Sequence, residues 1–323
     1  MTTGTPALSV VLVTPNAFST IRKTVRHLRA QSIHERIELL VVVPSRVTLD
    51  APPAELEGFA RWEVIELGET NNIARMKLEA VRRATAPVVV FAEDHCFPTP
   101  TWGAALLAAH DAGWEAVGPV VSNGNPGTRL SQAAFLLHWL SWTGPLPAGE
   151  THYLPWHNTS YRRRDLLALG ERLSELLPVE GFLQDELRAS GSRFYLEPAA
   201  CATHINMSRL RPWIGHGYWG GRMYAAFRSA RWPLPQRLLR VMGAPLVPGV
   251  RLLRILRDVR RSDELRALVP GVLPCLVLGL VIHAVGEVAG YLVGPGPSEE
   301  HYSWYEMNRA SHVTDAERSA LAA

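Results

Sequence analysis

The apolar run from Val88 to Ala92 is the feature that most constrains the fold of this chain. It is short, uninterrupted and rich in β-branched residues, which is typical of a strand buried on both faces of a parallel sheet. The run ends abruptly at Glu93, Asp94 and His95, and the segment Thr99–Trp102 then supplies a capping residue and a proline suited to a first helical turn. The pattern therefore predicts two carboxylates and an imidazole at the carboxyl edge of a sheet, where open α/β folds bind ligands.

Strand and helix patterns alternate along the first part of the chain. Short β-branched runs predict strands, and apolar residues at helical spacing, such as Ile21, Val25 and Leu28, predict helices between them. This alternation predicts an α/β fold with a mainly parallel central sheet flanked by helices. The expected strands are Leu8–Val13, Ile37–Val43, Trp62–Leu67, Val88–Ala92, Ala116–Val121, Trp156–Tyr161, Phe194–Leu196 and Ala200–His204, and the expected helices include Ile73–Ala84 and Trp102–Asp111.

Length and composition indicate a globular protein of a reducing compartment. The 323 residues allow one large domain or two, and 47% of them are hydrophobic. The three cysteines, Cys96, Cys201 and Cys275, lack CxxC spacing, which argues against a disulfide framework. The N-terminus lacks a basic region followed by an apolar core, so we expect no secretory signal. The expected location is cytoplasmic, either free or peripheral on the inner face of the cell membrane.

Positive charge is concentrated in one part of the chain. The net charge is +3, but Arg209 to Arg261 contains twelve arginines and one acid, Asp258, so this stretch carries +11 and the remainder −8. Such asymmetry indicates a face that meets phosphate groups or a lipid surface. Nucleic acid is disfavoured as a partner because the arginines alternate with apolar residues and no nucleic-acid-binding motif is visible. We expect a domain of residues 1–208 and a helical region of residues 209–323.

The helical region contains an unusually apolar stretch. Ala267 to Gly286 comprises 20 residues without a formal charge, which is long enough to span a bilayer, although Pro270 and Pro274 disfavour a plain spanning helix. Two interpretations are open. In one, the region lies on an anionic membrane with residues 267–293 embedded. In the other, its apolar residues pack on the α/β domain or on a second subunit of a homo-oligomer.

Short motifs occur in a defined order between about Leu8 and His204. They are Ser9–Asn16 (SVVLVTPN), Met76–Ala80 with Ala84, Glu93–His95 (EDH), Pro98–Trp102 (PTPTW), His157–Arg163 (HNTSYRR), Asp165–Gly170 (DLLALG), Gln184-Asp185 and His204. In these motifs and their order the chain resembles the family 2 glycosyltransferases, which have a GT-A fold. The resemblance covers nearly two thirds of the chain and implies a GT-A domain that binds a nucleotide sugar.

The resemblance implies a divalent metal site. Glu93, Asp94 and His95 stand where the family has its D-x-D metal signature, and His204 stands where many members have a further ligand. Mn²⁺ or Mg²⁺ is the implied ion, and two imidazoles among the four groups favour Mn²⁺. The cation would neutralise the leaving diphosphate of the donor as the glycosidic bond breaks.

The resemblance also implies residues that bind the donor. The segment Thr14-Pro15-Asn16 ends the strand that lies against the nucleotide, and Asn158 belongs to the stretch that shapes the sugar and acceptor pocket. Lys77 and Arg222 are candidates for steadying the diphosphate. The family usually has an acid after its second strand that binds the base, but Val43-Pro44-Ser45 has none, so UDP and GDP both remain candidate carriers of the sugar.

The reaction that the resemblance implies is an inverting, metal-dependent transfer of a hexose from a nucleotide-diphosphate sugar to a hydroxyl acceptor. Asp185 corresponds to the family's catalytic base, with Glu186 as its neighbouring alternative. A lipid-linked sugar and a polysaccharide are both candidate acceptors. The alternative function is that of a catalytically inactive relative that docks on membranes or acts as a scaffold.

Overall fold

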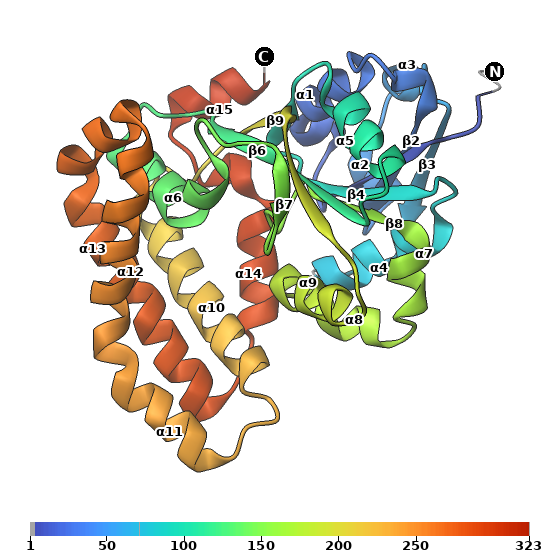
Figure 1. The fold of residues 1–323 in the computed structure, drawn as a ribbon. Helices are drawn as coiled ribbons and strands as arrows, with labels where there is room; N and C mark the ends of the chain where they lie inside the picture. The colour runs from blue at the N-terminus through green and yellow to red at the C-terminus, as the bar shows by residue number, and fades with distance from the viewer. Residues whose placement is uncertain (1–3, 71, 323) are drawn as a thin grey trace. The chain divides into compact units, whose positions relative to one another are not determined.

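The computed structural model describes residues 4–70 and 72–322, and internal contacts divide the chain into two compact units (Figure 1). We call them the sheet unit and the helical unit. The sheet unit contains the residues up to Ser122, Leu146–His204 and the residues from Ser319 on, and the helical unit contains Asn123–Pro145 and Ile205–Arg318.

This division differs in one respect from the expected boundary at residue 208. The main sheet-unit segment ends at His204, close to that boundary. Residues 123–145, however, lie within the expected first domain and belong to the helical unit. Their apolar side chains, such as Leu136 and Leu140, join the core of the C-terminal helices, which local sequence patterns do not reveal.

The sheet unit is built on one mixed sheet. Its strands are β1 Leu8–Val13, β2 Ile37–Val43, β3 Arg61–Glu66, β4 Val88–Ala92, β5 Cys96–Pro98, β6 Ala116–Asn123, β7 Gly149–Thr151, β8 Ser160–Arg162 and β9 Phe194–His204. In the described part of the chain the order is β3-β2-β1-β4-β8-β6-β9-β5, with β7 pairing with β9. Strands β1 to β4 are mutually parallel, whereas β8, β5 and β7 join the sheet through antiparallel pairs. The expected α/β fold is confirmed, and its parallel part is the half formed by β1 to β4.

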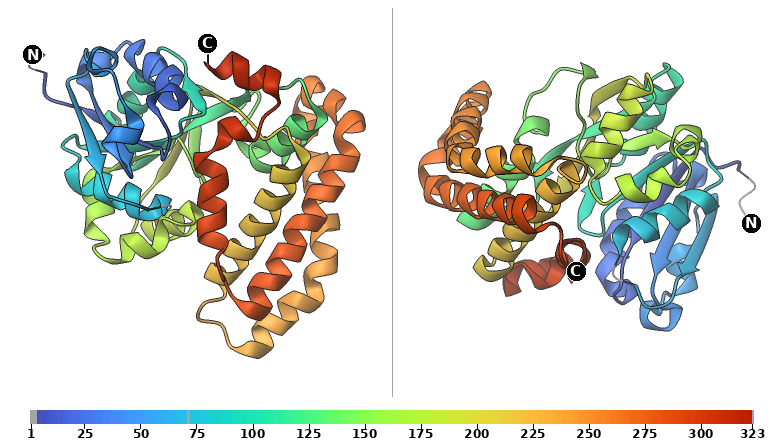
Figure 2. Two further views of the ribbon diagram at one scale, coloured as in Figure 1. Left: turned by 180° about the vertical axis from the view of Figure 1, so that it is seen from behind. Right: turned by 90° about the horizontal axis from the view of Figure 1, so that it is seen from below.

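Helices cover both faces of this sheet. Helices α1 and α5 lie on one side of the sheet, and helices α4, α8 and α9 lie on the other (Figures 1 and 2). Amphipathic patterning explains their docking, since α1 buries Phe18, Ile21, Val25 and Leu28 against the strands. The helices are α1 Phe18–Arg29, α2 Arg46–Leu49, α3 Pro53–Leu56, α4 Ile73–Arg83, α5 Trp102–Asp111, α7 Arg163–Ala168, α8 Arg172–Leu176 and α9 Glu180–Ala189, with a 3₁₀ turn η1 at His34–Arg36.

The helical unit is held together by close packing of two helices, α10 and α13. A Cβ atom added to Gly286 of α13 would lie 2.1 Å from the carbonyl oxygen of Tyr218 in α10, and one on Gly290 would lie 2.4 Å from that of Arg222. Only glycine allows the two backbones to approach so closely. The elements are α6 Arg129–His138, η2 Leu140–Trp142, α10 Leu210–Arg228, α11 Leu234–Gly243, η3 Ala244–Leu246, α12 Val247–Asp258, η4 Val259–Arg261, α13 Asp263–Val293, α14 Ser298–Met307, η5 Arg309–Ser311 and α15 Asp315–Ala322, the last of which extends into the sheet unit.

Helix α13 is long and apolar enough to cross a membrane, by length and composition. Pro270 and Pro274 lie inside the helix without ending it. One side of α13, which includes Val272, Leu276 and Leu280, is buried in the core of the helical unit. The opposite side is exposed, so a single helix combines a protein-packed face with a bare apolar face.

Candidate active site

Strand pairing brings the residues that follow β4 next to the end of β9. Strand β4 ends at Ala92, and a turn closed by the Cys96 N–H, which donates to the Glu93 carbonyl, leads into β5. Strand β5 pairs antiparallel with the end of β9, so that Cys96 lies opposite His204. Residues more than a hundred positions apart in sequence therefore share one edge of the sheet.

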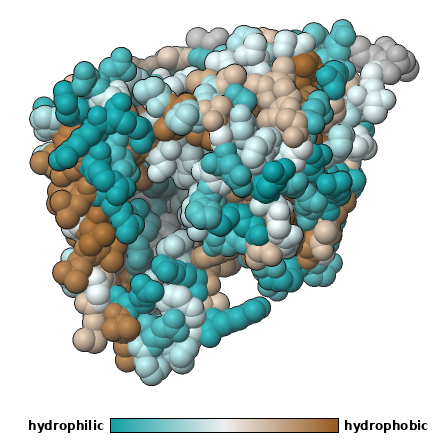
Figure 3. Space-filling model, in the orientation of Figure 1, coloured by the Kyte–Doolittle hydropathy of each residue, from teal (hydrophilic) through white to brown (hydrophobic). Residues whose placement is uncertain are grey.

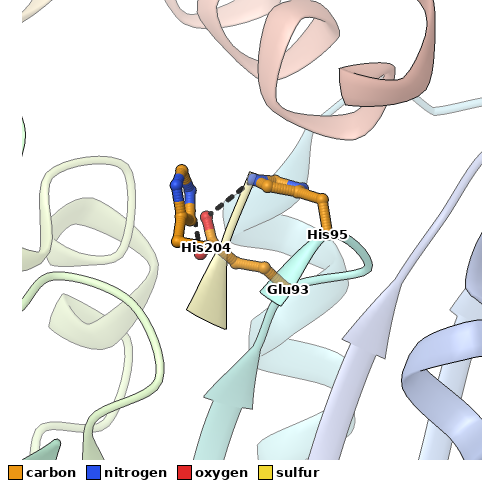
Figure 4. Close-up of side chains that lie close together, drawn as sticks. All are labelled: Glu93, His95 and His204. Carbon is orange, nitrogen blue, oxygen red and sulfur yellow. Dashed lines mark ion pairs between the residues drawn. The ribbon is translucent and has the colours of Figure 1, made fainter. Parts of the chain in front are cut away.

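Glu93, His95 and His204 form a compact, buried cluster (Figure 4). The Nε2 atom of His95 lies 3.5 Å from Oε1 of Glu93, and Nε2 of His204 lies 3.6 Å from Oε2 of the same carboxylate. The two imidazole rings meet edge to face with centroids 4.9 Å apart. One ligand atom of each residue lies within 4.8 Å of the others. Two imidazole nitrogens and a carboxylate converging in a buried space fit a divalent transition-metal ion.

Asp94 contacts His95, but it is not among the three residues whose ligand atoms converge. Its Oδ1 atom is 2.6 Å from Nδ1 of His95, while its backbone carbonyl accepts a hydrogen bond from Thr24 at 2.7 Å. When Nδ1 carries the proton and donates it to this carboxylate in a hydrogen bond, Nε2 has a lone pair that faces Glu93. The structure thus gathers three of the four predicted ligands, and Asp94 orients one of them.

Asn158 holds the central carboxylate from the other side. Its backbone has a φ of 60°, in the left-handed region that asparagine tolerates better than most residues. In this conformation its N–H donates to the Phe91 carbonyl at 2.8 Å, and its Nδ2 donates to Oε2 of Glu93 at 3.2 Å. The asparagine therefore fixes Glu93 relative to the end of β4.

His157 and Glu180 extend the cluster and were not among the predicted site residues. Nδ1 of His157 lies 3.7 Å from Oε1 of Glu93 and 3.7 Å from Oε1 of Glu180. The sequence signal that could have identified His157 is its position directly before Asn158 in the HNTSYRR motif. Glu180 begins α9, and nothing in the local sequence distinguishes it from an ordinary first-turn acid.

Glu180 is almost fully buried and is paired with Lys77. The Nζ atom of Lys77 lies 2.5 Å from Oε1 of Glu180 and 5.1 Å from the centroid of the Phe91 ring. The other carboxylate oxygen, Oε2, is buried and has no hydrogen-bond partner among the described residues. Burial raises the pKa of Glu180, and the charge of Lys77 opposes this rise. Lys77, predicted as a diphosphate ligand, thus has a carboxylate partner in the protein.

Asp185, the predicted base, is not brought to this cluster. It is exposed on α9, whereas Gln184 next to it is buried and accepts a hydrogen bond from the Leu154 N–H at 3.0 Å. Five residues along an α-helix correspond to a rotation of about 140°, so Asp185 and Glu180 lie on nearly opposite sides of α9. The alternative Glu186 is paired with Arg172 at 2.6 Å. A motif match does not show which side of a helix a residue faces, and this explains why Asp185 lies away from the predicted position.

The segment Thr14-Pro15-Asn16 follows β1 at the same edge of the sheet. Thr14 is buried, its N–H donates to the Val42 carbonyl at 3.1 Å, and its hydroxyl accepts the Asn16 N–H at 3.2 Å. Because Leu12 pairs with Ala92, this segment and Glu93 both leave the sheet at its carboxyl edge.

An acid lies next to the end of β2 although none follows β2 in sequence. Glu66, the last residue of β3, is paired in register with Val43. Its Oε1 accepts the backbone N–H of Arg46 at 3.3 Å. A carboxylate thus lies beside Val43, on the neighbouring strand β3.

Arg222, the second predicted diphosphate ligand, belongs to the helical unit. Its Nε donates to the Gly294 carbonyl at 3.0 Å, and its guanidinium lies 5.6 Å from the centroid of the Trp219 ring. The hydrogen bond to Gly294 joins α10 to the end of α13, whereas the contact with Trp219 lies within α10.

Comparison with a protein-family model covers the first half of the chain and ends before His204. The family model described as Glycosyl transferase family 2 matches residues 9–170, about half of the chain. This span contains β1 to β4, the Glu93–His95 segment and Asn158. A comparison with curated proteins found no match.

Proposed function

Since the chain belongs to glycosyl transferase family 2, which makes it a glycosyltransferase with a nucleotide-sugar donor and an acceptor, we propose that it moves a hexose with inversion at the anomeric carbon. The donor is a UDP- or GDP-sugar, and the acceptor is a hydroxyl group of a lipid-linked sugar or a polysaccharide. The observation that carries this proposal is the buried cluster of Glu93, His95 and His204 at the carboxyl edge of the sheet.

The proposed reaction depends on a divalent cation held by these three residues, with Mn²⁺ favoured over Mg²⁺ because imidazole suits it better. When bound, the cation supplies positive charge that stabilises the leaving diphosphate. Asp94 accepts the proton of His95 Nδ1, so that Nε2 is the nitrogen that would bind the cation, and Asn158 holds the Glu93 carboxylate in position.

We assign the proton acceptor to Glu180 rather than to Asp185. The support for Glu180 is its burial, its unpartnered Oε2 atom, and its link through His157 to Glu93. A base must come within hydrogen-bond reach of the acceptor hydroxyl beside the donor, and the exposed face of α9 argues against Asp185. Lys77 offsets part of the cost of burying the Glu180 charge, and the raised pKa that burial gives Glu180 suits a group that takes up a proton.

A head-to-head comparison of two variants tests this assignment. Purified protein is screened against UDP- and GDP-sugars with Mn²⁺, and released nucleoside diphosphate is measured. Glu180→Gln should lower turnover by about 10²-fold or more while retaining nucleotide binding, and Asp185→Asn should remain active. Loss of activity in Asp185→Asn alone would refute the assignment. If no donor is turned over with any metal and no nucleotide raises the melting temperature, the inactive scaffold becomes the better description.

A further inference from the structure

Helices α11 and α12 leave a row of large apolar side chains exposed. Within the helical unit this row runs along α11, crosses η3 and continues on α12. The exposed fractions of Met242 and Leu246 are 77% and 72%, far above what a core-facing residue has. Figure 3 shows hydrophobic residues gathered along the edge that these helices form, with hydrophilic residues beside them. The members of the row are Leu234, Leu238, Leu239, Met242, Leu246, Val250 and Leu253.

The exposed side of α13 adds a second apolar row in the same unit. Its members recur at helical spacing, so they form one stripe along the helix. Helix α13 packs against both α11 and α12, so the two rows lie on adjacent helices of the same unit. We call the two rows together the apolar plate. The residues that α13 contributes are Leu273, Val277, Leu278, Val281, Val285, Leu292 and Val293.

Unpaired positive charge accompanies the apolar plate. The chain has no Asp or Glu between Glu197 and Asp258, a stretch that includes all of α11 and nearly all of α12. Arg240 and Arg254 are exposed, and the described residues form no salt bridge with either of them. Arg240 instead lies 5.5 Å from the centroid of the Trp232 ring. A plate of leucine and valine with unpaired arginines matches an anionic lipid surface in both polarity and charge.

We propose that the apolar plate docks on the interface of a bilayer that contains anionic phospholipid, with α11 and α12 lying in the plane of the interface. A second copy of this chain is a poorer occupant, since a symmetric contact would bring the same arginines against one another. Bound in this way, the protein is peripheral. The inference rests on the helical unit alone and is independent of the reaction proposed for the sheet unit.

The inner side of α13 explains why this helix lies on the membrane rather than across it. Gly286 and Gly290 pack against the α10 backbone. On the same helix, Nδ1 of His283 lies 3.0 Å from Oε1 of Glu287 and 3.0 Å from a guanidinium nitrogen of Arg251 in α12, and that nitrogen lies 3.7 Å from the Glu287 carboxylate. Crossing the hydrocarbon core would break these contacts and expose the polar groups to lipid.

Vesicle co-sedimentation of the full chain, without detergent, tests the proposal. We expect the protein to sediment with vesicles of phosphatidylcholine containing phosphatidylglycerol, and much less with phosphatidylcholine alone. Added salt should weaken the binding because it screens the arginines from the lipid. Met242→Asp should lower the fraction bound about tenfold. Val47→Asp is the matched control, since Val47 is 87% exposed but belongs to the sheet unit, and it should bind like the unchanged protein.

Charge reversal provides an independent arm of the same experiment. Arg240→Glu should weaken binding to the anionic vesicles, whereas Arg164→Glu, an exposed change in the sheet unit, should not. Melting temperature and metal binding, measured for each variant, show whether the fold is retained. The proposal is overturned if the unchanged protein ignores anionic vesicles, or if Met242→Asp binds them equally well. It is also overturned if light scattering finds a dimer that Met242→Asp dissociates and that does not bind vesicles.

Discussion

Replacing Asp94 by asparagine tests whether Asp94 is a metal ligand, as the sequence predicts, or a hydrogen-bond partner that orients His95. As a ligand, Asp94 would be as important to metal binding as His204. In the structure its Oδ1 atom is 2.6 Å from Nδ1 of His95, and it is not among the three residues whose ligand atoms converge. The substitution retains the size of the side chain and removes its charge, so His95 loses a charge-assisted hydrogen bond but keeps its position in β4–β5.

The expected magnitude follows from this geometry. Loss of a carboxylate that orients a ligating histidine typically lowers metal affinity by about 10- to 100-fold, or about 1.4 to 2.7 kcal/mol. Asp94→Asn should therefore bind Mn²⁺ more weakly but still saturably. His204→Ala, which removes a converging nitrogen, should abolish saturable binding.

Calorimetric titration with Mn²⁺, supported by the electron paramagnetic resonance signal of the free ion, measures both variants. Thr20→Val is a useful control because it alters a hydroxyl on α1 outside the cluster. An Asp94→Asn protein that binds no Mn²⁺ would show that Asp94 is itself a ligand. An unchanged affinity would show that its contact with His95 does not matter to the metal, and either result would refute the reasoning.

Two further predictions concern stability. Gly286→Ala should destabilise the helical unit by about 1 to 3 kcal/mol, because its Cβ would meet the Tyr218 carbonyl at 2.1 Å. A Cβ on Gly271 in the same helix would meet no atom of the described residues within 4 Å, so Gly271→Ala should be neutral or slightly stabilising, and thermal unfolding compares the two variants. Burial lowers the pKa of His110 from 6.5 to about 4, so the unfolded chain binds a proton that the folded chain excludes. His110 thus contributes stability that is complete above pH 6.5 and is lost as pH falls towards 4, by about 3 kcal/mol at most. His110→Gln should flatten the decline of melting temperature over this range, and an unchanged slope would contradict the assignment.

Several elements could be predicted from local patterns. The expected strands Leu8–Val13, Ile37–Val43 and Val88–Ala92 have the bounds that the structure gives them. Each is a short, mainly apolar run rich in β-branched residues, so the structure favoured by its local sequence is the one that tertiary packing also requires. The strands predicted at Phe194–Leu196 and Ala200–His204, in contrast, are parts of the single strand β9. Its pairing with β5 and β7 carries the strand through Pro198, which a local pattern treats as a break.

The position of a site residue could be predicted where that residue lies directly at the end of a strand. Glu93 and His95 come straight after β4, and His204 ends β9, so their meeting depends only on strand order and register. Glu180 and Asp185 show the limit of this reasoning. Both are acids of one helix, and the rotation of α9 against the sheet decides that Glu180 is buried beside His157 while Asp185 faces solvent.

The sequence by itself determined the elements and the chemical character of their ends: buried parallel strands, acids and imidazoles after them, and a basic, apolar C-terminal region. Tertiary structure decided which of these groups meet. The physical reason is that strand register, helix phase and the backbone approach of α10 and α13 depend on contacts between residues far apart in the chain. These contacts turn Asp94 into a support for His95, bury Glu180 against Lys77, and leave one face of α11, α12 and α13 uncovered.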